Sequence, residues 1–202
     1  FMEYVRGLKE QGIIRHIGMS THNPAVAKMG ALCGEIEMIL FSINPAFDML
    51  PASENIEDYF KERYEVELGG IAPERAELYR ICEQEEVGIT VMKGYAGGRL
   101  FSAEASPFGV ALTPVQCLHY ALTRPAVASV MVGYDTPEHV AAAVAYESAS
   151  EEEKDYATVL AGAPHHAYAG QCTYCGHCAP CPAAIDIAMV NKLYDLAVMQ
   201  NE

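Results

Sequence analysis

The stretch EMILFSIN, residues 37–44, is an almost unbroken apolar run, and a run of this kind decides the fold. Nearly continuous apolar stretches of this length, rich in β-branched residues, are typical of strands buried on both faces of a sheet. Three similar runs occur along the chain: IIRHIGMS at 13–20, GITVMKG at 88–94 and ASVMVG at 128–133. The sequence therefore predicts four buried strands.

Segments with helical spacing separate these runs. The segment 73–87 carries Leu78, Ile81 and Cys82 on one apolar face, and the segment 23–34 does the same with Val26, Met29, Leu32 and Cys33. Thr113 and Thr136 each precede a proline and a helical pattern, which is typical of a capped helix start. Strands that alternate with helices predict an α/β fold with a parallel sheet covered by helices.

Composition excludes several classes of function. The chain has 202 residues and a formal net charge of −14, which argues against nucleic acid as a partner. No apolar run reaches the ~18 residues of a membrane-spanning helix, and the first residues lack a secretory signal. Seven cysteines without such a signal predict a reducing compartment, and hence a cytoplasmic location. Because position 1 is not methionine, we expect the chain to be cut from something longer.

Two further expectations concern structure outside the strands. Cys33, Cys82 and Cys117 lie on apolar helical faces and are predicted to be buried as small hydrophobic residues. The connection 45–72 is long for this kind of fold and is predicted to be a lid or excursion, with Asp48 and Glu54 solvated on it. A change in character near residue 150 predicts two parts, a sheet domain over 1–150 and a helical tail over 151–202.

The tail contains the sequence QCTYCGHCAPCPAAIDI at 171–187, in which four cysteines recur every third position. Thiolates are soft ligands that favour iron–sulfur clusters and zinc. The run Cys172, Cys175, Cys178, Cys181, Pro182 is one residue shorter in its last gap than the bacterial ferredoxin pattern, and it predicts a single [4Fe–4S] cluster held by all four. A structural zinc ion is the alternative, although zinc ribbons usually split their ligands into two distant pairs.

Several stretches in order resemble the second half of an aldo/keto reductase: GLKEQGIIRHIGMSTH, ILFSINPAFD, ELYRICEQEEVGITVMKGYAGGRL, LTPVQCLHYALTRPAVASVMVGYDTPEHV and CTYCGHCAPCPAAIDI. More narrowly they resemble the branch with a C-terminal 4Fe–4S ferredoxin-type segment, and the likeness runs from about residue 4 to 190. It implies a partial (β/α)8 barrel in which the four strands match strands five to eight. The family's catalytic tetrad lies in the first half, so the resemblance assigns no catalytic residue to this chain.

The resemblance does imply contacts to NAD(P)H. Ser20 and Thr21 fall where the family holds the nicotinamide carboxamide, with Thr21 in place of the usual Asn. Lys93 and Gly94 fall where the pyrophosphate is contacted, and Gly133 begins the segment GYDTPEHV, which opens a helix whose free amides would face a phosphate.

Besides Thr21, three further positions depart from the family's pattern. Leu40 replaces a Gln that holds the nicotinamide, and Met92 replaces the stacking Tyr. The Arg that the family often uses for the NADP 2′-phosphate is not evident after the fourth run, where Asp135 stands instead. The choice between NAD(H) and NADP(H) therefore stays open.

Three functional hypotheses follow. The first is the C-terminal part of an NAD(P)-linked aldo/keto reductase-type oxidoreductase with a [4Fe–4S] cluster. The intact enzyme would act on a small carbonyl or alcohol substrate. This fragment alone would not catalyse hydride transfer. The second is an iron–sulfur electron-transfer or interaction module that meets an electron-transfer partner and performs no reductase chemistry. The third is a half-barrel that forms a homodimer, because the strands at 13–20 and 128–133 would each lack a neighbour.

Overall fold

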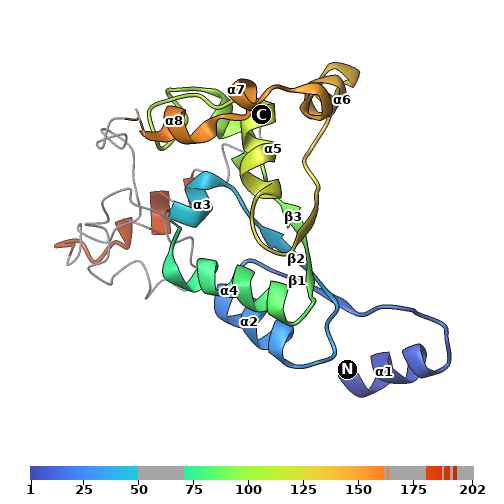
Figure 1. The fold of residues 1–202 in the computed structure, drawn as a ribbon. Coiled ribbons are helices and arrows are strands. Elements are labelled where there is room, and N and C mark those ends of the chain that lie inside the picture. Colours follow the sequence, from blue (N-terminus) through green and yellow to red (C-terminus); the bar gives the residue numbers. More distant parts are fainter. Residues whose placement is uncertain (50–70, 162, 164–180, 188, 192, 195–202) are drawn as a thin grey trace.

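The computed structural model describes residues 1–49, 71–161, 163, 181–187, 189–191 and 193–194 (Figure 1). The elements of the first half are α1 (Met2–Glu10), β1 (Gly18–Thr21), α2 (Pro24–Leu32), β2 (Met38–Ser42), α3 (Pro45–Met49), α4 (Pro73–Gln84) and β3 (Gly88–Met92). They are followed by the 3-10 segment η2 (Ala96–Phe101), α5 (Pro114–Leu122), β4 (Val127–Val130), α6 (Pro137–Val144), η3 (Ala145–Ser148), α7 (Glu151–Lys154) and α8 (Tyr156–Ala161).

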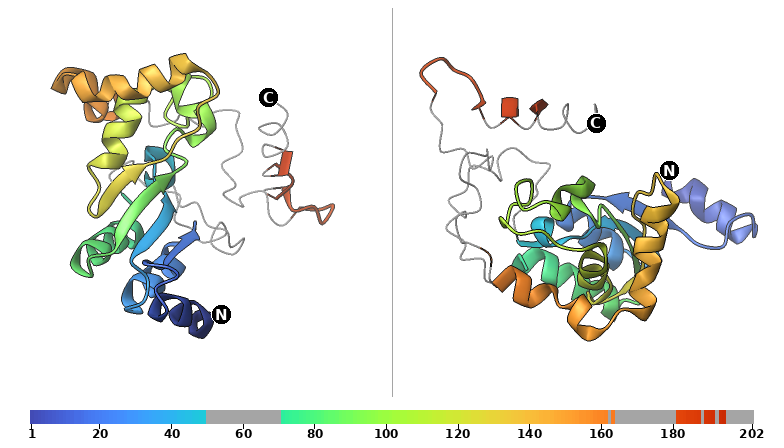
Figure 2. Two further views of the ribbon diagram at one scale, coloured as in Figure 1. Left: turned by 90° about the vertical axis from the view of Figure 1, so that its right-hand side faces the viewer. Right: turned by 90° about the horizontal axis from the view of Figure 1, so that it is seen from above.

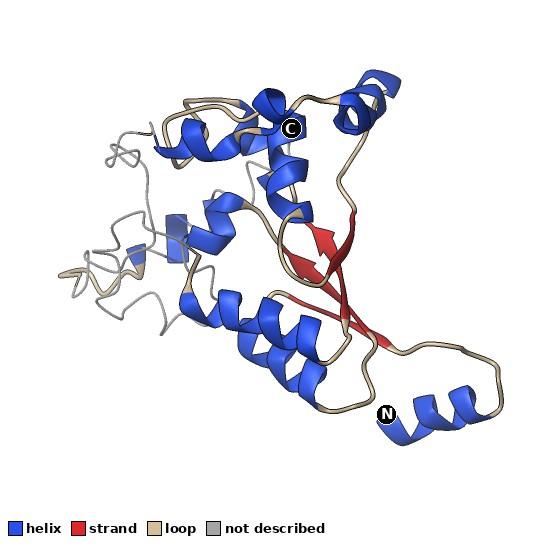
Figure 3. Cartoon of the chain, in the orientation of Figure 1, coloured by secondary structure: helices blue, strands red, loops and turns tan. Residues whose placement is uncertain are grey.

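The four strands form one parallel sheet in the order β1-β2-β3-β4. Each strand therefore pairs with the next strand along the chain, and the helices between them carry the crossovers (Figure 3). The prediction of a parallel α/β sheet with four strands is confirmed. The first predicted run, 13–20, pairs only from Gly18 onward, and Ile13 at its start is largely exposed.

Helix caps fix where the helices begin. The Thr113 hydroxyl accepts the backbone N–H of Gln116, whose side chain accepts the N–H of Thr113 in return, so that α5 starts with a complete capping box. Asn23 caps α2 and Thr136 caps α6, and each is followed by a proline in the first turn. The predicted helix starts at Thr113 and Thr136 are confirmed.

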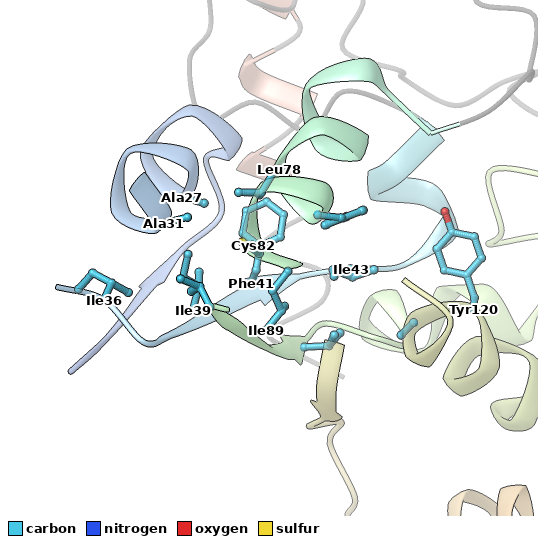
Figure 4. Close-up of a cluster of buried hydrophobic side chains, with 14 of the residues drawn as sticks. Ala27, Ala31, Ile36, Ile39, Phe41, Ile43, Leu78, Cys82, Ile89 and Tyr120 are labelled. Atoms are coloured by element: carbon cyan, nitrogen blue, oxygen red, sulfur yellow. The ribbon is translucent and has the colours of Figure 1, made fainter. Parts of the chain in front are cut away.

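The main core lies between the sheet and its helices (Figure 4). Along β2 and β3 alternate side chains point into it, because successive residues of a strand face opposite sides of the sheet. Helix α4 supplies the cover for these strands, and α2 packs beside it (Figures 1 and 2). Core residues from the sheet and these helices are Ile39, Phe41, Ile43, Ile89, Val91, Ala27, Ala31, Leu78, Tyr79 and Cys82.

The opposite face of the sheet is less covered, especially at its two edge strands. Ser20 on β1 and Ser129 on β4 are exposed there, and Met38 of β2 is 47% exposed. Thr90, in the middle of the same face, is buried and accepts a hydrogen bond from the Ser129 hydroxyl at 3.2 Å. As predicted, the first and last strands each have one neighbour within the described part of the chain.

Two predictions about helical faces need correction. In α2 the buried residues are Ala27 and Ala31, whereas Met29 is 73% exposed and Cys33 lies exposed at the C-cap. The small alanine side chains let the helix approach the core closely, and this places its larger apolar residues outward. Cys82 and Cys117 are fully buried, as predicted.

Ion pairs attach helix α1 and the turn after it to the end of the sheet where β2 begins. Lys9 Nζ lies 2.5 Å and His16 Nδ1 2.6 Å from the two oxygens of Glu37, at the start of β2. Arg6 pairs with Glu35 in the same way at 2.8 Å. The hydrogen bonds from Lys9 and then His16 lower the pKa of Glu37 to about 2.

The segment after residue 150 begins on the sheet domain. Gln116 of α5 donates its side-chain amide to the Asp155 carbonyl at 3.0 Å, and Arg124 donates to the Tyr156 hydroxyl at 2.8 Å. Ala163 is buried in a second core with Cys117. The predicted division at residue 150 stays a prediction, although α7 and α8, which follow it, both pack against α5 of the sheet domain. No helix among the described residues has the length and hydropathy needed to cross a membrane.

Candidate functional site

The predicted cofactor residues gather at one edge of the sheet. Parallel strands all end at the same edge, so the turns that follow β1, β2, β3 and β4 lie along it in that order. In folds of this kind ligands bind outside the carboxyl ends of the strands. With ~4.8 Å between neighbouring strands, the exits of β1 and β3 lie about 10 Å apart. We therefore call this edge the carboxyl edge.

At the exit of β1, Ser20 is exposed on the less covered face of the sheet. The Thr21 hydroxyl accepts the backbone N–H of Asn23 at 3.1 Å, which shapes the turn into α2. Among the described residues no acceptor for the Thr21 hydroxyl proton is found. Ser20 and Thr21 both lie at the carboxyl edge, and their contact with the cofactor stays a prediction.

At the exit of β3, Lys93 is exposed and its backbone has a φ of 61°. Gly94 is buried, and a Cβ atom there would lie 2.9 Å from Cγ1 of Val132, which follows β4. Gly97 and Gly98 also have positive φ, 68° and 82°. Backbone conformation and close packing therefore already explain the glycines of KGYAGG, because they form a tight turn packed against the exit of the next strand.

Gly133, after β4, is different. It is exposed, and its φ is not in the left-handed region. Apart from its chain neighbours, no described residue has an atom within 4 Å of the position a Cβ would occupy. Neither packing nor backbone conformation requires glycine here, which leaves room for a ligand to approach the main chain. The nearby Asp135 carboxylate lies against His139 in the first turn of α6.

Asn44, at the exit of β2, belongs to this edge but was not predicted from the sequence. Its side chain is fully buried, accepts the backbone N–H of Phe47 and donates to the Lys93 carbonyl, both at 2.9 Å. The sequence signal that could have found it is Asn followed by Pro45 at the start of a helix.

Tyr95 adds a buried hydroxyl in the turn after β3. Its ring packs against Phe101, with centroids 4.8 Å apart. Within the described ranges no group lies at hydrogen-bonding geometry to its hydroxyl. Burial, and then the nearby Tyr134 and Cys117, raise the pKa of Tyr95, so its hydroxyl stays protonated.

Asp48 was predicted to be solvated, and this is wrong. Its side chain is fully buried and accepts hydrogen bonds from Arg75 Nε at 2.7 Å, the Tyr79 hydroxyl at 2.6 Å and the Tyr120 hydroxyl at 2.9 Å. Arg75 also donates to the Ser42 carbonyl. The buried carboxylate is thus fully paired. We call these four side chains, Asp48, Arg75, Tyr79 and Tyr120, the Asp48 clasp.

The clasp holds the carboxyl end of β2 to α4 and α5. Burial, and then the negative charge of Asp48, raise the pKa of both Tyr79 and Tyr120, which keeps their hydroxyls protonated as donors. The Ala72 N–H donates to the Asp48 carbonyl at 2.7 Å, so the two ends of the long connection meet at its base. Glu54 lies outside the described residues.

Three of the four predicted cluster ligands, Cys172, Cys175 and Cys178, also lie outside the described residues. Cys181 is described as half-buried with a free thiol. Within the described ranges no group of three or more His, Cys, Asp or Glu side chains is placed to hold a metal ion. The metal site therefore stays a prediction.

Comparison with solved structures identifies the fold. The chain superposes on aldo-keto reductase AKR11C1 from Bacillus halodurans, in its holo form, with a TM-score of 0.54 and 21% identity over 81% of this chain. The apo form of the same enzyme gives a TM-score of 0.53 at 21% identity, also over 81% of this chain. This chain has the fold of part of an aldo-keto reductase.

Other comparisons add little. The thermostable aldo-keto reductase Tm1743, in complex with the inhibitor epalrestat, gives a TM-score of 0.45 at 19% identity over 79% of this chain and 53% of that one. No protein-family model matches the chain. A search of curated proteins finds no match either. The chain spans 55% and 56% of the AKR11C1 structures, so about half the length of the reductase it matches.

Proposed function

We propose that this chain is the C-terminal part of an NAD(P)H-dependent oxidoreductase of the aldo-keto reductase type, with an iron–sulfur cluster in its tail. The observation that carries the proposal is the sheet itself. Four parallel strands in sequential order, joined by helices, match half of an aldo-keto reductase, and the residues expected to meet the cofactor share its carboxyl edge.

The rest of a barrel would complete the active site. Four βα units cannot close a barrel that needs eight strands. Within the part of the chain that the structure describes, β1 and β4 each have one side without a neighbouring strand, and the face bearing Ser20, Met38 and Ser129 is partly exposed. Both features suit four further strands. These would supply the catalytic groups and, with the cofactor, the pocket for a small carbonyl or alcohol. A homodimer of half-barrels is the other way to cover this face.

The residues at the carboxyl edge fit NAD(P)H in part. The Lys93 ammonium is exposed and suits a diphosphate, and the open main chain at Gly133 lets a phosphate approach backbone amides. The hydroxyls of Ser20 and Thr21 suit the nicotinamide carboxamide. When bound, the cofactor supplies the hydride. The chain's own contribution is to hold the nicotinamide and the diphosphate of the cofactor in place.

The cysteine tail fits an iron–sulfur cluster by the chemistry of its donors. Four thiols spaced three positions apart, followed by proline, form a soft donor set for iron. Such a cluster supplies single-electron transfer, or it fixes the tail without redox chemistry. Zinc bound by the same thiols is the alternative occupant.

The experiment that tests both parts is an anaerobic purification followed by two measurements. Iron and acid-labile sulfide are quantified, and NADPH and NADH are titrated separately by the change in their fluorescence. We expect about four irons and four sulfides per chain, and saturable binding that weakens in a Lys93→Ala variant. Stoichiometric zinc without sulfide would contradict the iron–sulfur cluster. If neither NADPH nor NADH binds, the cofactor site is contradicted.

One observation favours the iron–sulfur module as a second candidate. Leu40, on the central strand β2, and Met92, at the end of β3, replace the Gln and Tyr that the resemblance expects against the nicotinamide. A chain that does not bind nicotinamide would not need the Gln and Tyr side chains at these two positions. A protein with a full cluster and no affinity for either nucleotide would support this candidate.

A further inference from the structure

Helix α3 carries a buried polar residue at each end. Asp48, near its last residue, belongs to the Asp48 clasp, which fixes the helix to α4 and α5. Asn44 precedes its first residue and is fully buried. The Asn44 side-chain oxygen accepts the Phe47 N–H, which caps α3, while its amide nitrogen donates to the Lys93 carbonyl. A single amide thus joins the anchored helix to the turn after β3.

The turn after β3 needs to be held. Lys93 has a φ of 61°, a left-handed conformation that is unfavourable for a residue with a Cβ and persists where the surroundings fix it. Its carbonyl accepts the Ala96 N–H at 2.8 Å as well as the Asn44 amide. On the other side Gly94 packs against Val132. The exits of β2 and β4 therefore hold the turn between them.

We propose that Asn44 is a positioning residue: by bonding the Lys93 carbonyl, it holds the turn in the conformation that presents the Lys93 ammonium to an anionic ligand at the carboxyl edge. This inference rests on the proposed function, in which the anion is the diphosphate of NAD(P)H. Asn44 itself does not touch the ligand. Its effect on binding passes through Lys93.

The test compares two matched exchanges at helix N-caps. In Asn44→Ser the hydroxyl still caps α3, because serine is a favourable N-cap, but it carries no amide to reach Lys93. In the control, Asn23→Ser, the hydrogen bonds of the exchanged side chain within the described residues go to Ala25 and Val26 of its own helix. Both variants are titrated with NADPH in the wild-type and the Lys93→Ala background, and their urea midpoints are measured.

We expect Asn44→Ser to weaken NADPH binding by about three- to tenfold, the range for one lost hydrogen bond, and Asn23→Ser to change it less than twofold. In the Lys93→Ala background Asn44→Ser should have no further effect, because the group it positions is gone. In the wild-type background, Asn44→Ser should also reduce the salt dependence of NADPH binding, because salt screens the exposed charge contact that Lys93 makes. A loss of stability alone would produce neither result.

Two results overturn the inference, and they are distinguishable. If the intact chain binds NADPH but the effects of Asn44→Ser and Lys93→Ala add, Asn44 acts independently of Lys93 and only this inference fails. If the intact chain binds neither NADPH nor NADH, the proposed function fails and this inference fails with it.

Discussion

The Asp48 clasp makes a strong prediction about stability. Asp48 and Arg75 have side-chain exposures of 0% and 2%, and their ion pair of 2.7 Å lies in the interior. Asp48→Asn keeps the shape of the side chain, but it turns one acceptor oxygen into an NH2 donor and leaves the Arg75 guanidinium as an unpaired buried charge. Removing one partner of a buried pair destabilises by about 3–5 kcal/mol. Because a domain is stable by only about 5–15 kcal/mol, the loss should be large.

The effect of the neutral hydrogen bonds should be smaller. Tyr120→Phe removes one donor to Asp48, and we expect it to lower the free energy of unfolding by about 1 kcal/mol. In the double variant Asp48→Asn/Arg75→Met no buried charge remains. The cost of an unpaired buried charge is then absent, so the double variant should be more stable than Asp48→Asn alone.

Equilibrium urea denaturation followed by circular dichroism measures these free energies, with the m-value as a check that unfolding remains two-state. The wild type, Asp48→Asn, Arg75→Met and the double variant form a complete cycle. If Asp48→Asn costs less than about 1 kcal/mol, or if the two single effects add within about 0.5 kcal/mol, the clasp is not a coupled buried ion pair and the reasoning fails.

Three further predictions concern separate parts of the chain. The pKa of Glu37 is lowered to about 2 in the folded state, so its contribution to stability is present above pH 4.5 and is lost as the pH falls toward 2. In urea titrations at pH 2–6, a Glu37→Gln variant should lose this part of the pH dependence. A variant with the same pH profile as the wild type would contradict this role of Glu37. Gly94→Ala should lower the free energy of unfolding by about 1–3 kcal/mol through the clash with Val132, and the second change Val132→Ala should restore most of it; no rescue would show that packing is not the reason for glycine. Cys33 is exposed, whereas burial raises the pKa of the Cys117 thiol to about 12, so alkylation followed by peptide mass spectrometry should label Cys33 quickly and Cys117 only after unfolding; equal rates would contradict the burial.

The strands and helix starts could be predicted because their signals are local. Four apolar runs, the Thr113 capping box and the prolines after each cap are all contained in short stretches of sequence. The parallel sheet followed from the alternation of strands and helices, and its sequential order agrees with the barrel that the resemblance implies.

The errors came from contacts that are distant in sequence. The burial of Asp48 depends on Arg75, Tyr79 and Tyr120, which lie 27 to 72 positions away, so its own surroundings in the chain gave only the picture of a solvated loop. The apolar spacing of the second helix did not show that alanines would make the closest approach to the core.

The candidate site could be predicted only in part. The resemblance placed Ser20, Thr21, Lys93, Gly94 and Gly133 on strand exits, and the structure brings all these exits to one edge. It did not reveal Asn44, because a buried amide that joins two strand exits leaves no periodic pattern. It also could not show that Gly94 has a packing role while Gly133 has none.

Hydrogen–deuterium exchange with and without NADPH tests the central claim most directly, because it locates the ligand on the sheet. The account predicts slower exchange at residues 20–21, 93–98 and 132–136, at the exits of β1, β3 and β4, with little change at the opposite end of the strands, near residues 35–38. Unchanged exchange at all three exits under saturating NADPH, or protection confined to another surface, would contradict the assignment of the carboxyl edge as a dinucleotide site.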